Sequence, residues 1–585
     1  MFVTSIICFT KLGYFNVWRQ GVLKSNMSFK TQIEEHKKVI TVILSFSLII
    51  SVLTVVFLVW NTGSSDILPN TSIVKTAMPT IPPIDNSPII AQENALPGTS
   101  AWMLDKGARM NFIQDYLGVS SITPGGNVPV YVSSPASVKY IIQVYRLGWY
   151  NGLGGKFVTQ SPQLTSLAQG YWYPGPGLIN CKSCVITPST HTIDANWKIS
   201  YQLQVNADWL SGVYLLKFVS HQPGIFAESF ATLIVRNDSS HSTFLVDYPT
   251  NTDQAYNYWG GYSTYVHATK SSIPGDETNS FDRAPVVSFN RPYWADDGAG
   301  SLFDFEIGTI RFLERSGYNV TYTTDVALSE NPQLMLNHKA VIIMGHDEYW
   351  TVSMRDGAET AVKDGVSFAF LGANDCYWQS RYLPDMHGNK DRLFVSYKVK
   401  SNVPVFSEQL KLDPYYAKQP SLVTTMWRDT LIKRPENALM GLMYLSYFTP
   451  GKYAPDWVVS QTAASSLFLT GTGLYPGEHI KGGLLGYEVD GVVNNGFTPK
   501  NEVILAQSPV VDAYKHTILA STGYYYAPSG ALVFDAGSIW WGWGLDGLSP
   551  PGATPHLLHG NASIQALTTN IFNAMATNQI PSSQP

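Results

Sequence analysis

The chain has 585 residues, of which 45% are hydrophobic and 13% aromatic, and its formal net charge is −5 at pH 7. This composition is typical of a folded protein, and a mildly acidic chain without a basic run argues against nucleic acid as a partner. A chain of this length is too large for one hydrophobic core, so two or more domains are expected.

The first predicted element is a transmembrane helix over residues 39–60. Its sequence, VITVILSFSLIISVLTVVFLVW, has no charged residue and is long enough to cross a hydrocarbon core of about 30 Å. Four lysines lie between residues 24 and 38, and no Lys or Arg follows the segment before Lys75. The basic flank predicts a cytoplasmic N-terminus (1–38) and a single-pass protein of the cell membrane with its C-terminal bulk outside the cell.

A cleaved signal peptide is the alternative for this segment, because a signal peptide also begins with a basic region. The long apolar stretch and the lack of a small-residue cleavage site after Trp60 favour an uncleaved anchor. Residues 61–98 are rich in Pro, Ser, Thr and Asn with apolar residues scattered singly, which predicts an extended extracellular tether.

Residues 99–237 contain short runs of β-forming residues separated by turn residues. The clearest runs lie at 128–134, 139–147, 198–205, 212–220 and 229–236. Their alternation with a period near two predicts an antiparallel β-sandwich domain. Nothing in this domain resembles a catalytic motif.

Two of the four cysteines form the motif NCKSC in a loop rich in Pro and Gly. Outside the cell, Cys181 and Cys184 most simply form a local disulfide. A zinc site is the alternative, but no second CxxC supplies the two further ligands that zinc would need. Cys376 is expected to be buried and unreactive.

From residue 240 the pattern changes to strands that alternate with helices. Strands are predicted at 242–247, 318–324, 338–345 and 366–372, and helices at 303–317 and about 351–363. This order predicts right-handed crossovers and a mostly parallel sheet with helices on both faces. The segment 400–585 is rich in Gly and aromatic residues and is interpreted as a β-rich part that completes an α/β domain over 240–585. The predicted fold class is therefore α/β, with an N-terminal transmembrane helix, a β-sandwich and this mostly parallel-sheet domain.

Functional groups of a parallel sheet collect just beyond the carboxyl ends of its strands. Residues 346–350 (HDEYW) follow one predicted strand, and residues 374–378 (NDCYW) follow the next. The polar residues that could carry chemistry are Tyr256, Tyr258, Tyr265, His346, Glu348 and Glu488. Phenols and carboxylates are hard oxygen donors, and a cation that binds tyrosine must drive the loss of a phenol proton, which suits ferric iron better than Zn²⁺ or Mg²⁺.

Structural explanations exist for each of these residues. A single tyrosine in a chain with this many tyrosines is most often a packing residue, and an HxE pair arises by chance in ordinary loops. Glu488 could form a salt bridge or a cap. A Ser-His-Asp hydrolase has no support, because no GxSxG motif follows a strand. Glycosidase chemistry with Glu348, Asp375 and Glu488 stays open, because the sequence does not give the distance between the carboxylates.

Several motifs together carry a resemblance to a known family. They are YPTNTDQAYNYWGGYSTYVH, FLERSGYNVTYTTD, GHDEYW, FLGANDCYW, GYEVDG and GSIWWGWGLD, with YRLGWYNGLGG (145–155) in the β-domain. In this order, residues 240–545 resemble the C-terminal part of the large (beta) subunit of N,N-dimethylformamidase, an iron-dependent amidohydrolase. That enzyme holds a mononuclear iron with two tyrosines and one glutamate, and it requires a small alpha subunit that this chain does not contain.

The resemblance implies roles for individual residues. Carried over motif by motif, Glu348 and Tyr265 are metal ligands, and His346 and the second glutamate, Glu488, lie beside them as catalytic residues. Tyr256 is the best match for the other tyrosine ligand. Tyr258 is its alternative, because the family has a longer segment between its two tyrosines.

The leading hypothesis is a surface-exposed, membrane-anchored, iron-dependent hydrolase of the C–N bond of a small amide, in which Glu488 helps to activate water. An oligomer or a second subunit is expected as partner. The rival hypotheses are a non-catalytic surface protein that binds glycans or another partner, and a carbohydrate-active enzyme without iron.

Overall fold

The computed structural model describes residues 87–106, 108, 110–174, 177–265, 283–398, 408–449, 454–551 and 554–577. All of them belong to one compact unit, Met78–Pro585. The predicted cytoplasmic segment, the anchor and residues 61–86 of the predicted tether lie outside the described residues. Residues 87–98 are described and include the helix α3 (Pro88–Asn94). The division of the remaining chain into domains at 237–240 stays a prediction.

The predictions of a transmembrane helix and of a single-pass membrane protein have to be corrected. Across the described ranges, none of the helices combines the length and the apolar character that a membrane span requires. This finding contradicts the membrane component of the predicted fold class, localisation and partners. The apolar run that motivated it, residues 39–60, lies outside the described residues.

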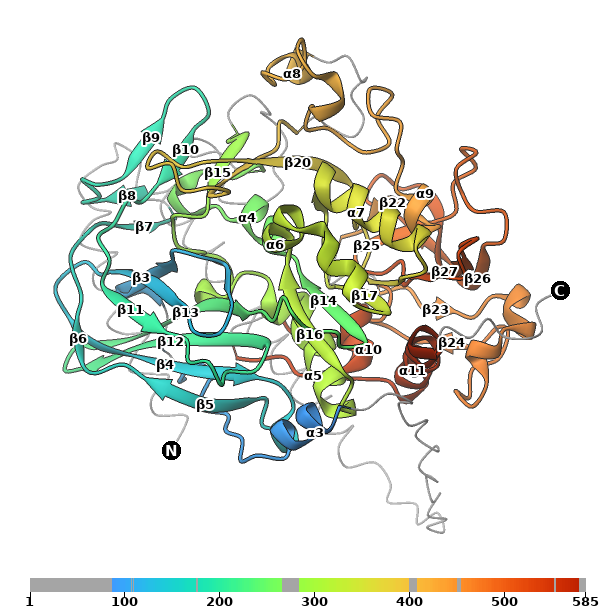
Figure 1. Cartoon of the computed structure of the whole chain (residues 1–585), viewed down its shortest axis with the longest axis horizontal. Helices are drawn as coiled ribbons and strands as arrows, with labels where there is room; N and C mark the ends of the chain where they lie inside the picture. Colours follow the sequence, from blue (N-terminus) through green and yellow to red (C-terminus); the bar gives the residue numbers. More distant parts are fainter. Residues whose placement is uncertain are drawn as a thin grey trace, which may run out of the picture. The chain divides into compact units, whose positions relative to one another are not determined.

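The N-terminal half contains two facing sheets (Figure 1). The larger sheet has the order β2 (Ser121–Ile122), β13 (Ile225–Val235), β12 (Gly212–Gln222), β4 (Lys139–Leu147) and β5 (Gly155–Gln160), with β6 (Leu164–Thr165) on β4. The smaller has the order β1 (Gln114–Leu117), β3 (Asn127–Ser133) and β11 (Tyr201–Gln204). Alternate apolar side chains of both sheets, such as Val130, Val144 and Leu216, fill one core between them. Nearby lie the hairpins β7 (Tyr171–Tyr173) with β8 (Gly177–Ile179), and β9 (Val185–Thr187) with β10 (Thr192–Asp194).

A seven-stranded sheet forms the centre of the second half. Its order is β16 (Val320–Thr324), β14 (Phe244–Tyr248), β17 (Ala340–Met344), β19 (Ser367–Leu371), β28 (Leu532–Asp535), β27 (Thr517–Tyr526) and β26 (Val503–Val511). The first five strands are parallel to one another, and the last two pairings, β28 with β27 and β27 with β26, are antiparallel. The strands and helices expected between 242 and 372 are present, because their apolar periodicity matches the faces that they bury.

Helices cover both faces of this sheet (Figure 1). Core residues of α5 (Ile307–Ser316), α10 (Trp541–Leu545) and α11 (Ala562–Thr577) pack on one face, and those of α6 (Asp325–Glu330), α7 (Val352–Lys363) and α9 (Asn437–Met440) on the other. Gly317 ends α5 in the left-handed conformation (φ 68°), as the sequence predicts for a C-cap. The remaining α-helices of the described residues are α3 (Pro88–Asn94), α4 (Thr250–Tyr256) and α8 (Glu408–Lys411).

Smaller sheets complete the edge of the central sheet. A four-stranded sheet has the order β15 (Val286–Ser288), β21 (Leu393–Val395), β20 (Trp378–Leu383) and β18 (Tyr349–Thr351). Two further pairs are β22 (Met443–Tyr447) with β25 (Glu488–Gly491), and β23 (Trp457–Val458) with β24 (His479–Ile480). Several connecting segments therefore meet beside the carboxyl ends of the parallel strands. They are the chain between β14 and β15 and the segments that follow β17, β19 and β22.

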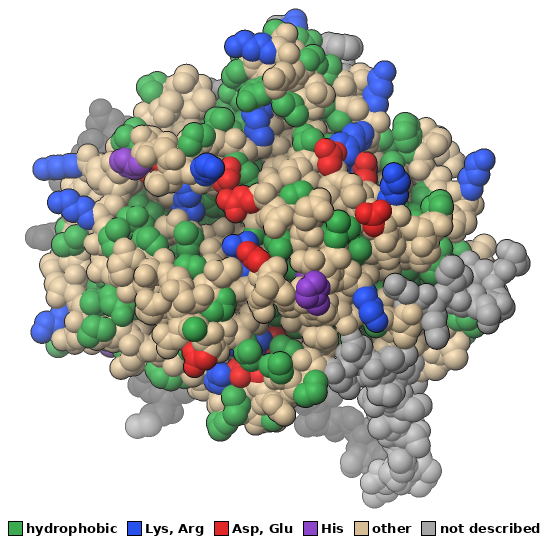
Figure 2. Space-filling view, in the orientation of Figure 1, with side chains coloured by type: hydrophobic (Ala, Val, Ile, Leu, Met, Phe, Trp, Pro, Cys, Tyr) green, Lys and Arg blue, Asp and Glu red, His purple; other side chains and the backbone are tan. Residues whose placement is uncertain are grey.

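The local disulfide predicted for the NCKSC loop is confirmed. Cys181 and Cys184 are bonded, with their Cα atoms 5.3 Å apart, and Cys376 is a free, buried cysteine. On the face seen in Figure 2, charged side chains of both signs are scattered among neutral ones.

Candidate metal and active site

Four segments supply the predicted site residues. The turn after β14 leads into α4, which ends at Tyr256, the chain between α4 and β15 carries Tyr265, and the chain after β17 carries His346 and Glu348. Glu488 begins β25, and its backbone carbonyl accepts a hydrogen bond from Ile539 just beyond β28. The backbone N–H of Glu348 donates to Thr252 Oγ1 at 2.9 Å, which ties the loop after β17 to α4. These ties bring segments that are far apart in the sequence to one place.

The carboxylate of Glu348 is the centre of the cluster. The Tyr265 hydroxyl lies 2.9 Å from Glu348 Oε1 and 2.8 Å from Oε2, and the Tyr256 hydroxyl lies 2.9 Å from Oε2. The two phenol rings stack with centroids 4.2 Å apart. Glu348 and Tyr265 are buried and Tyr256 is half-buried, so three oxygen donors converge in a place with little access to water.

The structure distinguishes the two candidates for the first tyrosine. Tyr256 reaches Glu348, whereas the ring of Tyr258 packs edge-on against Trp172 at 5.6 Å and lies 6.4 Å from Trp294. Tyr258 follows α4 by two residues, and its ring belongs to an aromatic cluster with the β-rich half. Tyr256 is therefore the tyrosine that accompanies Tyr265.

His346 lies between the two predicted glutamates. Its Nε2 atom is 3.4 Å from Glu348 Oε2 and 3.4 Å from Glu488 Oε2. Its Nδ1 atom is 3.1 Å from the carbonyl oxygen of Ala373, so Nδ1 carries a proton and Nε2 faces the carboxylates. Asn374 donates from Nδ2 to Glu488 Oε2 at 3.1 Å and fixes that carboxylate.

The charges of the cluster depend on one another. Burial opposes the ionised form of Glu348, but Lys398 and His346 outweigh it and lower the pKa of Glu348 to about 2. Burial likewise opposes a charge on His346, yet Glu488 and Glu348 raise its pKa to about 9. Burial, with His346 opposing it, raises the pKa of Glu488 above its ordinary value.

The pKa values of the two phenols are shifted in the direction that opposes metal binding. Burial first, and then the Glu348 carboxylate, raise the pKa of Tyr256 and of Tyr265 well above the ordinary value near 10. Both phenols therefore keep their protons and donate them to Glu348. Only a strongly charged cation in place of those protons would turn the phenols into phenolates.

Three further residues complete the cluster and were not among the predicted site residues. Trp378 donates from Nε1 to Glu348 Oε1 at 2.8 Å. Lys398 Nζ donates to the Tyr349 hydroxyl at 2.8 Å, lies 3.7 Å from Glu348 Oε1 and lies 3.3 Å from the ring centroid of Tyr265. Tyr349 and Trp378 are in the strand-end motifs of the sequence. No sequence signal marks Lys398, which follows β21 in an ordinary loop.

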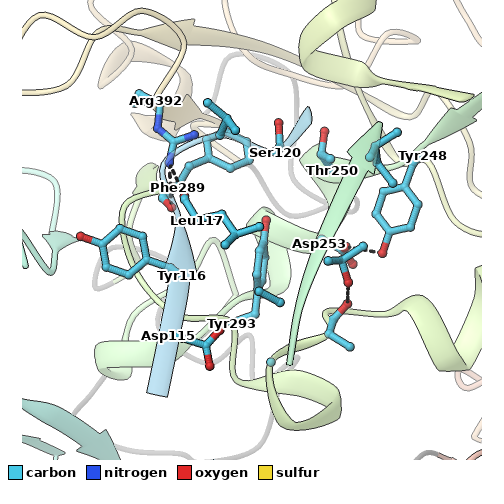
Figure 3. Close-up of a pocket in the computed structure, with 16 residues that line it drawn as sticks. Asp115, Tyr116, Leu117, Ser120, Tyr248, Thr250, Asp253, Phe289, Tyr293 and Arg392 are labelled. Atoms are coloured by element: carbon cyan, nitrogen blue, oxygen red, sulfur yellow. Dashed lines mark hydrogen bonds between the residues drawn. The ribbon is translucent and has the colours of Figure 1, made fainter. Parts of the chain in front are cut away.

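A cavity of about 210 Å³ opens beside this cluster. Tyr256 and His346 form one part of its wall. The aromatic residues Tyr258, Tyr293, Phe305 and Tyr487 line it together with polar residues that include Asp253 and Asp304. A separate cavity of about 40 Å³ adjoins β1 and includes Tyr248, whose hydroxyl donates to Asp253 at 3.2 Å (Figure 3). None of the predicted site residues lines that smaller cavity, whereas Tyr256, Tyr258 and His346 line the cavity of about 210 Å³, which is therefore the candidate substrate pocket.

The residues present fit a ferric ion. Tyr256, Tyr265 and Glu348 offer two phenol oxygens and a carboxylate within hydrogen-bond distance of one another, and Glu348 is held ionised. Hard anionic oxygen donors are the ligand class that a small, highly charged cation prefers. Nitrogen and sulfur ligands, which soft metals favour, are represented here only by His346.

Comparison with known proteins gives one family match. Residues 141–556 match the family described as "N,N-dimethylformamidase beta subunit-like, C-terminal", which confirms the resemblance inferred from the motifs. No curated protein matches the chain. A solved family 123 glycoside hydrolase from Clostridium perfringens, studied for glycolipid glycan hydrolysis, has 8% identity and a TM-score of 0.10 over 52% of this chain and 54% of that one. The chain spans about half the length of that structure, and a likeness this weak carries no argument.

Proposed function

Because this chain belongs to the N,N-dimethylformamidase beta subunit-like, C-terminal family, we propose that it is a hydrolase of the C–N bond of amides. The observation that supports the proposal most is the convergence of the Tyr256 and Tyr265 hydroxyls on the Glu348 carboxylate. These three residues are the ligand set that the sequence motifs imply. A packing role alone gives no reason for a buried and a half-buried phenol to share one ionised carboxylate.

We propose that Tyr256, Tyr265 and Glu348 hold a mononuclear ferric ion. When bound, such an ion supplies Lewis acidity, which polarises an amide carbonyl and lowers the pKa of water. Trp378 Nε1 and Lys398 Nζ lie on the Oε1 side of Glu348, where they keep the carboxylate ionised and fix its orientation. His346 lies on its Oε2 side.

Glu488 and His346 have the proton-transfer roles in this proposal. Glu488 takes a proton from the attacking water as the new C–O bond forms, and it returns that proton to the amine nitrogen as the C–N bond breaks. Its pKa is raised by burial, which suits a group that must both accept and donate a proton near neutral pH. His346, with Nδ1 fixed on the carbonyl of Ala373, directs Nε2 toward this exchange.

The pocket suggests the kind of substrate. Its wall combines aromatic rings with polar residues such as Asp253, Asp304 and His346, so it would accept a small amide whose apolar substituents contact the rings. The family description refers to a beta subunit, and we propose a second subunit as partner. Light scattering of the purified chain, alone and with candidate small subunits from the same source, measures this assembly.

Metal analysis and a visible spectrum of the full chain test the proposal. We expect one iron per chain and a tyrosinate-to-iron charge-transfer band, both lost in Tyr265→Phe and Glu348→Ala. Tyr258→Phe is the matched control and keeps both, because its ring packs on Trp172 and not on Glu348. Absence of iron after reconstitution, with unchanged folding of both variants, would overturn the proposal and favour a non-catalytic binding protein.

A further inference from the structure

Three aspartates lie at the carboxyl ends of three adjacent parallel strands. Asp247 lies in β14, Asp325 follows β16 as the first residue of α6, and Asp347 follows β17. One carboxylate oxygen of each lies within 4.8 Å of those of the other two. All three side chains are buried, with at most 1% of each residue exposed. Three carboxylates this close repel one another strongly unless a positive charge or protons lie between them.

Only some of the carboxylate oxygens in this cluster accept a hydrogen bond. Asp325 Oδ2 accepts the backbone N–H of Asn251 at 2.7 Å, and Asp347 Oδ2 accepts Trp350 Nε1–H at 2.8 Å. Beyond contacts with one another and with the backbone of Tyr248, the second oxygen of each and both oxygens of Asp247 have no well-aligned donor among the described residues. Buried polar atoms are almost always paired, so four such oxygens at one place indicate a missing partner.

A neighbouring hydroxyl provides an independent indication. Thr323 of β16 is the register partner of Asp247 of β14 in the parallel pair, so both side chains leave the same face of the sheet. Thr323 is 1% exposed, and its Oγ1 atom also has no partner among the described residues. A neutral hydroxyl does not belong to the acidic cluster, yet it needs a polar partner in the same place.

We propose that Asp247, Asp325 and Asp347 bind a hard divalent cation of the Mg²⁺ or Ca²⁺ class. Carboxylate and hydroxyl oxygens are the ligands that these ions prefer, and carboxylate oxygens on opposite sides of Ca²⁺ are separated by about twice its 2.3–2.6 Å ligand distance. Among the described residues no phenol hydrogen-bonds these three carboxylates, so the cluster differs in ligand chemistry from the site at Glu348. Its role is structural.

This second cation would position the active-site loop. Asp347 lies between His346 and Glu348 in the sequence, and Asp325 holds the start of α4 through Asn251. A cation bound to both would fix the loop after β17 relative to the helix that ends at Tyr256. The inference does not depend on the proposed amide hydrolysis or on iron.

Metal analysis of the full chain tests it, after dialysis against Mg²⁺ and Ca²⁺ and then against metal-free buffer. We expect one equivalent of a divalent cation in the wild type and in Glu348→Gln, and its loss in Asp247→Asn. Asp356→Asn, an exposed aspartate (59%), is the matched control and keeps the cation.

A terbium probe gives a second readout that needs no variant to fold. Tb³⁺ replaces Ca²⁺ in oxygen sites, and Trp350, whose Nε1 is 2.8 Å from Asp347, is near enough to sensitise its luminescence. We expect saturable luminescence of the wild type, which excess Ca²⁺ removes. No retained cation and no sensitised luminescence in the wild type would overturn the proposal. The aspartates would then share protons, and Asp247→Asn would be more stable than the wild type at neutral pH without added metal.

Discussion

Two buried glutamates, one in each half of this molecule, lie beside a histidine but have different charged neighbours. Glu228 of β13 lies 3.0 Å from His221 Nε2, and its other oxygen lies 3.1 Å from Lys217 Nζ. Glu488 of β25 lies 3.4 Å from His346 Nε2. Glu228 has an ammonium group close to it in the same sheet, and its histidine is one-third exposed (33%).

Glu488 must instead share its partner. His346 Nε2 is equally distant from Glu348, and the neighbouring ammonium of Lys398 lies on Glu348. A carboxylate with its own positively charged partner stabilises one state of the protein. A carboxylate that competes with another carboxylate for one proton can change its protonation state. The comparison therefore separates a structural glutamate from a reactive one, and four experiments address it.

The largest effect is expected from Glu488→Gln. Loss of the group that transfers protons should lower kcat by about 10²–10⁴-fold, while iron content and the visible band stay those of the wild type. Steady-state kinetics with a small amide, combined with metal analysis, measures both. If kcat falls only in proportion to lost iron, Glu488 is a structural residue like Glu228.

Glu228→Gln should give the opposite pattern. It removes the nearer carboxylate from Lys217, whose side chain is 4% exposed, and leaves Asp105 Oδ1 at 4.0 Å as an acidic partner, so the free energy of unfolding should fall by about 3 kcal/mol. The kcat of the folded variant should not change. Chemical denaturation measures the loss, and Asp238→Asn, at an exposed ion pair, serves as the control with a loss below about 1 kcal/mol. A large change in kcat at unchanged stability would contradict the distinction.

Glu502 is another glutamate of this comparison, and its effect on stability depends on pH. Burial raises its pKa to about 8, and neither carboxylate oxygen has a hydrogen-bond partner among the described residues. The unfolded chain loses this proton near the ordinary value and the folded protein near pH 8, so the free energy of unfolding should fall as the pH rises between the two values. Glu502→Gln should remove this slope and stabilise the protein by roughly 2–3 kcal/mol at pH 8. Denaturation at pH 5 and pH 8 measures it, and an unchanged slope would contradict the assignment.

The smallest effect is expected from Asn374→Gly. Asn374 adopts φ 60°, which glycine tolerates, so the variant removes the Nδ2–H···Oε2 bond to Glu488 without backbone strain. We expect kcat to fall by roughly 10-fold, as for one hydrogen bond to a charged group, with KM and iron content unchanged. A pH–rate profile identical to that of the wild type would show that Asn374 does not influence Glu488.

Much of the fold could be predicted because local rules govern it. The helix that ends at Gly317 and the buried strands at 340–344 and 367–371 follow from apolar periodicity, and the bond between Cys181 and Cys184 follows from their short separation. The anchor prediction rested on the length and apolar character of residues 39–60, on their basic flank and on the lack of a cleavage site. It is contradicted because none of the helices in the described part of the chain is long and apolar enough to span a membrane.

The family and the group of candidate residues could be read from the motifs, because these place His346 and Glu348 directly after a buried strand. The choice between Tyr256 and Tyr258, which are two residues apart, was decided by the tertiary structure alone, since the aromatic packing around Trp172 turns one ring away. The long-range approach of Lys398 to Glu348, and the clustering of three strand-end aspartates, were decided in the same way. Local periodicity fixes which face a residue takes, but only the order and register of the strands fix which distant side chains share that face.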